Sequence, residues 1–222
     1  MIIDCISDLH GSRPSLAGGD LLIVAGDLTA SDTPEQLKEC FEWLDKQNYD
    51  KIMLVAGNHD GCIANNVKID DGRLMPVQSW MRGFYKIYYL EDIAKIYKDM
   101  KFYGSPWTPT FYNWHFMKDR GEPIKKMWDL IPDDTEVLIT HGPPFGIQDQ
   151  VKYSSKAQEG KFAGCEELRN AIDHRLKKLK LHVFGHVHEG YGKVIVSGVH
   201  HVNASIMDEG YRPVNAPIRI IL

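Results

Sequence analysis

The stretch LLIVAGDLTASDTPEQLKECFEWLDKQNYDKIMLVAGNHD, residues 21–60, carries the pattern that decides the fold. Its two apolar runs, 21–25 and 51–56, are rich in Val, Ile and Leu and are followed at once by Gly and polar residues, as is typical of strands buried on both faces. Between them, TPEQ (33–36) predicts a helix start with a threonine N-cap, a first-turn proline and a capping-box glutamine. Apolar residues then recur at helical spacing over 37–44. Strand, helix and strand in this order predict an α/β fold.

An apolar run followed directly by polar residues occurs five times along the chain. The five polar motifs are DLH (8–10), GD (26–27), GNHD (57–60), HGPP (141–144) and GHVH (185–188). Because ligands of α/β proteins gather beyond the carboxyl ends of the strands, we expect all five motifs to converge at one edge. A site built from residues 8 to 188 joins most of the chain, which favours a single domain over residues 1–222.

The rest of the chain predicts further helices and antiparallel strands. Helices are expected over 165–179, where leucine and isoleucine form an apolar stripe, and over 123–130. The region 75–107 indicates a hairpin or two strands, 193–205 indicates antiparallel strands, and 218–222 indicates a terminal strand. We therefore expect mixed β-sheets flanked by helices.

Composition favours a globular protein with no role on duplex nucleic acid. Of the residues, 43% are hydrophobic, and no apolar run approaches the roughly 20 residues that span a bilayer. The start MIIDCISDLHG lacks the segments of a secretory signal, and the four cysteines form no CxxC pair, so we expect a cytoplasmic protein without a disulfide framework and without membrane association. A net charge of −4 offers no basic face, and the one basic run, RLKKLK (175–180), is interpreted as the solvated end of a helix.

The polar motifs supply candidate metal ligands. They offer imidazole nitrogens with carboxylate and amide oxygens, and no thiolate, in Asp8, His10, Asp27, Asn58, His59, His141, His186 and His188. This set suits Mn, Fe, Zn or Ni better than Ca. Two ions about 3.5 to 4 Å apart would stabilise the attacking and leaving oxygens of a phosphate ester, with Asp27 as the bridging carboxylate. One strand-end histidine alone is more often a structural residue, and the five motifs together favour a metal site.

The ordered motifs resemble those of the calcineurin-like metallophosphoesterase superfamily, namely DxH, GDxx(D), GNH(D/E), H and GHxH. YGSPWTPTFYNW (103–114), LITHGPPFG (138–146) and HVFGHVHEGYG (182–192) resemble the branch of metallophosphoesterase-domain proteins that act as class III-type phosphodiesterases. The resemblance implies an α/β/β/α sandwich. It leaves residues 61–100 as a variable insert region within the domain, and GDLTA (26–30) lacks the further aspartate that some members carry.

Carried over by position, the resemblance also implies a ligand scheme. One metal is held by Asp8, His10 and His188, and a second by Asn58, His141 and His186, with Asp27 bridging the two. In that scheme a metal-bound hydroxide attacks phosphorus in line, while the metals and Asn58 offset charge on the nonbridging oxygens. His59 would face the substrate phosphate and protonate or hydrogen-bond the leaving oxygen, with Asp60 as a candidate to orient it.

The resemblance favours a phosphodiesterase acting on cyclic or other small nucleotides. The rivals are a phosphomonoesterase, a nuclease, which the lack of a basic groove disfavours, and a nucleotide- or metal-binding sensor with negligible turnover, which the complete ligand set disfavours. His115 and the aromatic residues of 107–114 either line a substrate pocket or pack in the core. The native substrate, the metal and the oligomeric state stay open.

Overall fold

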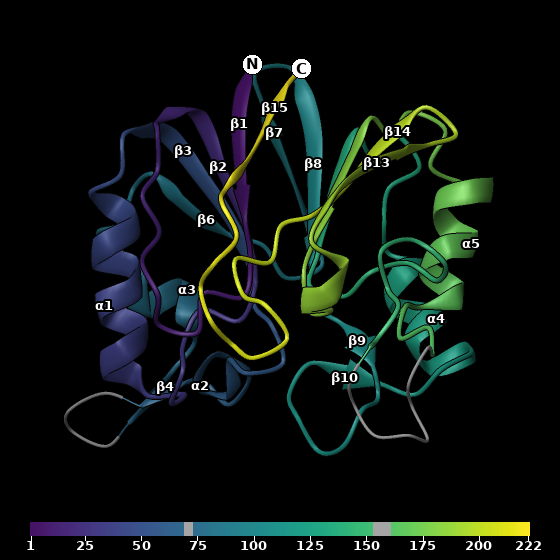
Figure 1. Ribbon diagram of the computed structural model, residues 1–222. Helices are drawn as coiled ribbons and strands as arrows, with labels where there is room; N and C mark the ends of the chain where they lie inside the picture. Colours follow the sequence, from purple (N-terminus) through teal and green to yellow (C-terminus); the bar gives the residue numbers. More distant parts are fainter. Residues whose placement is uncertain (69–72, 153–160) are drawn as a thin grey trace.

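The computed structural model describes residues 1–68, 73–152 and 161–222. Two β-sheets pack face to face, with helix α1 (Pro34–Asp45) outside one sheet and helices α4 (Glu122–Trp128) and α5 (Glu166–His174) outside the other (Figure 1). The expected α/β/β/α arrangement with mixed sheets is therefore confirmed. None of the helices in the described ranges is long and apolar enough to cross a membrane.

The first sheet contains the strand–helix–strand unit predicted over 21–60. Its strand order is β15 (Ile218–Ile221), β1 (Ile2–Ile6), β2 (Gly19–Ala25), β3 (Tyr49–Val55) and β6 (Ile87–Tyr89). Strands β1, β2, β3 and β6 run parallel to one another. Strand β15 pairs antiparallel with β1, so the first and last strands of the chain are neighbours (Figure 1).

The second sheet is parallel in its centre and antiparallel at both edges. Its strand order is β13 (Gly192–Val196), β14 (Val199–Asn203), β12 (Leu181–Phe184), β11 (Val137–Thr140), β8 (Met100–Ser105) and β7 (Ile93–Tyr97). The predicted antiparallel strands are the hairpins β7–β8 and β13–β14.

Short elements lie between and beyond the sheets. They are α2 (Gly61–Ala64), β4 (Val67–Lys68), β5 (Leu74–Met75), α3 (Val77–Trp80), β9 (Thr108–Pro109), β10 (Met117–Lys118) and a 3-10 turn at His188–Gly190. The range 61–100, described except for 69–72, also supplies β6 to the first sheet and β7 to the second. Its sequence variability stays a prediction.

Three apolar layers hold the elements together. The middle layer lies between the sheets and includes Ile23 and Val183, each with no exposed surface. The outer layers pack α1 on the first sheet through Phe41, and α4 and α5 on the second through Trp128 and Leu168. Because the central strands contact apolar layers on both faces, their sequences are continuous apolar runs.

The helix boundaries follow local hydrogen bonds, and two predictions were wrong. Thr33 caps α1 as expected, since its Oγ1 accepts from the backbone N–H of Gln36 at 3.2 Å, but the Gln36 side chain accepts from Ala30 and Ser31 instead of closing a capping box. Helix α5 ends at His174 and not at residue 179, so RLKKLK is not a helix end. Arg175 donates to the carbonyls of Trp128 and Ile131 and to Asp133. These bonds fix the chain in a turn directly after α5.

Candidate metal centre

The predicted site residues lie at the carboxyl ends of parallel strands from both sheets. Asp8 and His10 follow β1, Asp27 follows β2, and Asn58 and His59 follow β3, whereas His141 follows β11 and His186 and His188 follow β12. The Asp8 carboxylate joins the two groups, since it accepts from the backbone N–H of His186 at 3.0 Å. The structure therefore brings all five motifs together where the two sheets meet.

The first candidate metal-binding group consists of Asp8, His10 and His188. Their ligand atoms all lie within 4.8 Å of one another, and His188 Nε2 is 3.6 Å from Asp8 Oδ1. The Nδ1–H of His188 donates to the carbonyl of Asp208 at 3.0 Å, which leaves the Nε2 lone pair on the side of Asp8. His10 Nε2 is buried without a hydrogen-bond partner among the described residues. Buried polar atoms are rarely left unpaired, so this nitrogen fits a metal ligand.

The second group consists of Asp8, Asp27 and His141, again with ligand atoms within 4.8 Å. His141 Nε2 is 3.4 Å from Asp27 Oδ2, and its Nδ1–H donates to the carbonyl of Ala25 at 2.8 Å. When His141 Nε2 is protonated, it donates to the Asn58 amide oxygen at 2.9 Å, and when that proton is lost, the two atoms present lone pairs to each other. A cation shared by these two atoms satisfies both lone pairs, so Asn58 also fits the donor set.

Charge at the centre favours cations. Burial opposes ionisation of Asp8, but the hydrogen bond and charge of His188 lower its pKa to about 2. Burial likewise opposes ionisation of Asp27, but the neighbouring His141 holds its pKa below the ordinary value. Burial lowers the pKa of His186 to about 3, so that this ring is neutral. Burial opposes protonation of His141, but the charge of Asp27 raises its pKa to about 9, so a metal ion bound at this ring would displace a proton. The two ionised carboxylates and the neutral His186 are already in the protonation states that metal binding needs.

Unusual backbone conformations aim these side chains. Asp8, His10, Asp27 and His186 have φ between 40° and 69°, a left-handed region that residues other than glycine rarely adopt. Such strain clusters at functional sites, where the surrounding fold enforces it. Each strand thus turns sharply at its end and directs a polar side chain toward the centre.

Two motif glycines are explained by close approach of the ligands. A Cβ atom on Gly57 would lie 2.2 Å from Asp27 Oδ1. One on Gly185 would lie 2.1 Å from Ser7 Oγ and 2.3 Å from Asp8 Oδ2. Any side chain at these positions would displace a carboxylate, so the glycines of GNHD and GHVH make room for the site.

Asp60 positions backbone and does not hydrogen-bond the His59 side chain. Its buried carboxylate accepts from the backbone N–H groups of Gly57 at 2.8 Å, Leu28 at 2.9 Å and Thr29 at 3.3 Å. Burial, followed by the charge of Asp27, raises the pKa of Asp60 to about 7. Asp60 therefore ties the loop after β2 to the loop after β3, and the expectation that it orients His59 is corrected.

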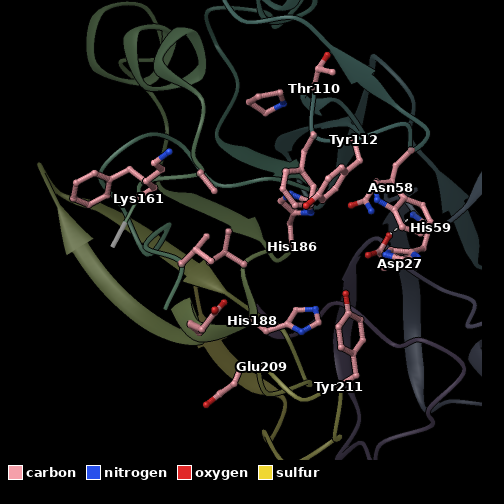
Figure 2. A pocket seen from close by; sticks show the side chains of 18 of the residues that line it. Asp27, Asn58, His59, Thr110, Tyr112, Lys161, His186, His188, Glu209 and Tyr211 are labelled. Carbon is pink, nitrogen blue, oxygen red and sulfur yellow. Dashed lines mark hydrogen bonds between the residues drawn. The ribbon is translucent and has the colours of Figure 1, made fainter. Parts of the chain in front are cut away.

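A cavity of about 510 Å³ opens beside the two groups. Asp27, Asn58, His59, His186 and His188 line it together with Phe111, Tyr112, Trp114, Phe162, Tyr211, Arg120, Lys161, Glu189 and Glu209 (Figure 2). The backbone N–H of His59 donates to Asp27 Oδ1 at 2.8 Å, and its ring centroid lies 4.2 Å from that of Trp114. This volume is in the range of small-molecule sites.

The candidate pocket residues of the aromatic segment divide into two kinds. Phe111, Tyr112 and Trp114 line the cavity. Trp107 instead donates its indole N–H to Asp92 at 2.7 Å and packs against the core. His115 does not line the cavity. Its ring lies against Gly61, the first residue of α2, where a Cβ atom would come within 2.2 Å of the ring Nε2.

Sequence reasoning missed Tyr211 and the rest of the segment that carries it. The ring of Tyr211 lies 5.0 Å from His10 and 4.8 Å from His188, between centroids. Burial, followed by the charge of Asp27, raises the pKa of its phenol. No apolar run precedes Tyr211, so the rule that found the other site residues gives no signal here.

The fold and the ligand groups together define a metal-dependent phosphoesterase, and comparison with known proteins agrees. The family model described as calcineurin-like phosphoesterase matches residues 1–190. The chain belongs to this family, a family of metal-using hydrolases of phosphate esters, which confirms the resemblance seen in its motifs.

Relatives and solved structures extend this result. Metallophosphoesterase domain-containing protein 1 of Homo sapiens is 38% identical over 236 residues, covering 98% of this chain and 70% of that protein. A 3′,5′-cyclic-nucleotide phosphodiesterase of Nostoc sp. is 25% identical over 185 residues, covering 82% of this chain and 60% of that protein. The crystal structure of phosphopantetheinyl hydrolase from Mycobacterium tuberculosis matches with a TM-score of 0.62 and 13% identity, covering 99% of this chain and 95% of that chain, which supports the fold alone.

Proposed function

We propose that the protein is a dinuclear-metal-dependent phosphodiesterase acting on cyclic or other small nucleotides. One observation carries the proposal: two groups of metal-ligating side chains share Asp8 and lie beside one cavity. Ions held by both groups would be close enough to act on a single phosphate. In this proposal Asp8, His10 and His188 hold one ion, Asn58, His141 and His186 hold the other, and Asp27 lies between them.

The metal ions, for which the donor set favours Mn, Fe, Zn or Ni, would supply Lewis acidity at the phosphate oxygens and lower the pKa of the attacking water. His59 serves the leaving group. Its backbone is fixed by Asp27 and its ring is flanked by Trp114, while the ring nitrogens make no hydrogen bond within the described residues. The His59 ring is therefore available to hold a proton at the leaving oxygen.

The cavity wall supports a substrate with an aromatic group. Phe111, Tyr112 and Trp114 line the cavity beside His59, and aromatic side chains of this kind can stack on a nucleobase. The Nostoc relative is named for activity on 3′,5′-cyclic nucleotides, which supports the same substrate class. A cyclic nucleotide presents one phosphodiester, which would face the ligand groups, and one base, which would face the aromatic residues of the cavity.

The test is a set of assays supplemented with Mn, Fe, Zn or Ni in turn. Substrates are bis(p-nitrophenyl) phosphate, p-nitrophenyl phosphate and 2′,3′- and 3′,5′-cyclic nucleotides. We expect the diesters to be preferred. Preference for the monoester would establish a phosphomonoesterase instead, and binding of nucleotide with no turnover under any metal would establish a sensor.

Variants separate metal binding from proton transfer. Asp27→Ala is expected to lose turnover together with bound metal, whereas His59→Ala loses turnover and keeps metal, measured by elemental analysis. His174→Ala, at an exposed position on α5, is the matched control. Full activity of the Asp27→Ala protein would contradict the dinuclear assignment.

We also place the protein in the cytoplasm. Its four cysteines, at positions 5, 40, 62 and 165, are all free. Disulfides are rare in that compartment, so free and mostly buried thiols suit it. Cell fractionation with an antibody to the chain tests the assignment, and recovery from a secreted fraction would overturn it.

A further inference from the structure

A hydrogen-bonded loop over residues 208–215 lies against one side of the candidate metal centre. The Asp208 carboxylate accepts from the backbone N–H groups of Gly210 and Arg212, both at 2.9 Å, and from Arg212 Nε at 2.7 Å. Asn215 ties the loop back to the fold by donating to the carbonyls of Ser205 and Met207. The loop therefore has a defined shape.

This loop contacts the candidate metal ligands at two points. The carbonyl of Asp208 accepts the Nδ1–H of His188, and the ring of Tyr211 packs edge-on against both His10 and His188. The proposed first metal site is thus bordered by the Asp208 backbone and by the Tyr211 ring, both in contact with His188.

Packing against His10 and His188 explains only part of the placement of Tyr211. The residue is 57% exposed, so its ring gains little from burial, and its φ of 58° lies in the left-handed region. An exposed tyrosine held in an unfavourable backbone conformation points to a role for the side chain.

The Tyr211 hydroxyl is directed into the cavity and is free to act. Figure 2 shows it beside His188, with the hydroxyl oxygen toward Asp27 and His59. Within the described residues it makes no hydrogen bond. A phenol O–H can donate one hydrogen bond.

We propose that Tyr211 is a substrate-binding residue whose hydroxyl donates a hydrogen bond to a phosphate oxygen bound at the His10–His188 side of the centre. The ring of His59 also lies beside His10, at 4.9 Å between centroids. The phosphate would then contact two side-chain donors, His59 and Tyr211, one from each end of the chain. This inference deepens the proposed function and rests on it for the nature of the ligand.

The experiment measures binding of inorganic phosphate by calorimetry to manganese-loaded protein. Tyr211→Phe removes the hydroxyl and keeps the ring contacts with His10 and His188. Because a hydrogen bond to a charged acceptor is lost at a half-exposed position, we expect phosphate affinity to fall about tenfold. Metal content and thermal midpoint should equal those of the parent. Tyr85→Phe, at a position 86% exposed and outside this cavity, is the control and should bind phosphate normally.

A parallel assay with bis(p-nitrophenyl) phosphate separates this inference from the proposed function. A tenfold loss of phosphate affinity in Tyr211→Phe supports the role of Tyr211 even if the parent protein hydrolyses no ester, in which case only the proposed function fails. Equal phosphate affinity of parent and Tyr211→Phe, or no phosphate binding by the parent at millimolar concentration, overturns the inference.

Discussion

Acidification is expected to destabilise the protein through two buried histidines outside the metal centre. His182 on β12 and His201 on β14 are at most 1% exposed, and their ring centroids lie 5.5 Å apart. The Thr140 hydroxyl donates to the carbonyl of Gly142, so it accepts from His182 Nε2 at 2.8 Å. The Nδ1 atoms of both rings are buried with no hydrogen-bond partner in the described ranges. Both rings are therefore neutral in the folded protein.

The pKa values give the size of the effect. Burial, followed by the charge of Arg169, lowers the pKa of His201 from 6.5 to about 4, and burial holds the pKa of His182 well below 6.5. Below pH 6.5 the unfolded chain binds protons at these positions and the folded protein does not, so stability falls as pH decreases toward 4. At about 1.4 kcal/mol per pH unit, His201 alone costs about 2 kcal/mol at pH 5.

Urea unfolding of the parent and His201→Phe at pH 7 and pH 5, at equal metal concentration, measures this cost. Because the variant lacks the titrating ring, the parent should lose about 2 kcal/mol more free energy of unfolding than the variant when the pH falls from 7 to 5. His174→Phe, at an exposed position of α5, should show no such movement. If the parent and His201→Phe lose stability equally on acidification, His201 does not remain neutral in the fold and the reasoning fails.

Three further substitutions test the local geometry. Asp60→Asn leaves fewer acceptors for three backbone N–H groups and should lower the free energy of unfolding in urea by about 1 to 3 kcal/mol. An unchanged free energy of unfolding would show that these hydrogen bonds do not stabilise the fold. Gly185→Ala should displace the Asp8 carboxylate and weaken metal binding at least tenfold by titration, whereas unchanged affinity would show that the backbone yields. Thr33→Ala removes the acceptor for the Gln36 N–H and should cost about 1 kcal/mol in thermal unfolding, and no change would mean that the cap is dispensable.

Most of the fold could be predicted because strands buried on both faces leave a strong local signal. Runs such as 21–25 and 52–56 are apolar throughout, and Gly and polar residues follow them directly. The same signal located the candidate ligands, since each follows the end of a parallel strand. This signal did not show that the five strand ends belong to two different sheets. Pairing between distant strands depends on residues far apart in the sequence, and a short apolar run carries no information about its partner.

The features that escaped prediction depend on contacts between distant segments. The apolar stripe through Leu176 and Leu179 favoured a longer helix, but Arg175 donates to one carbonyl at the end of α4 and to another just beyond it, and the helix ends early. Tyr211 reaches the centre only because its loop folds against His188. Asp60 lies next to His59 in sequence, yet it bonds backbone groups of two loops.

The division of the ligands between two sheets has a consequence for folding kinetics. The first sheet carries Asp8, His10, Asp27 and Asn58, and the second carries His141, His186 and His188. An intermediate in which one sheet has formed without the other would lack part of each proposed ion site, so tight metal binding must await docking of the two sheets. Metal would then bind the native state and not its precursors, slowing unfolding more than it speeds folding. The moment at which the chain acquires metal would report the moment at which the sheets meet.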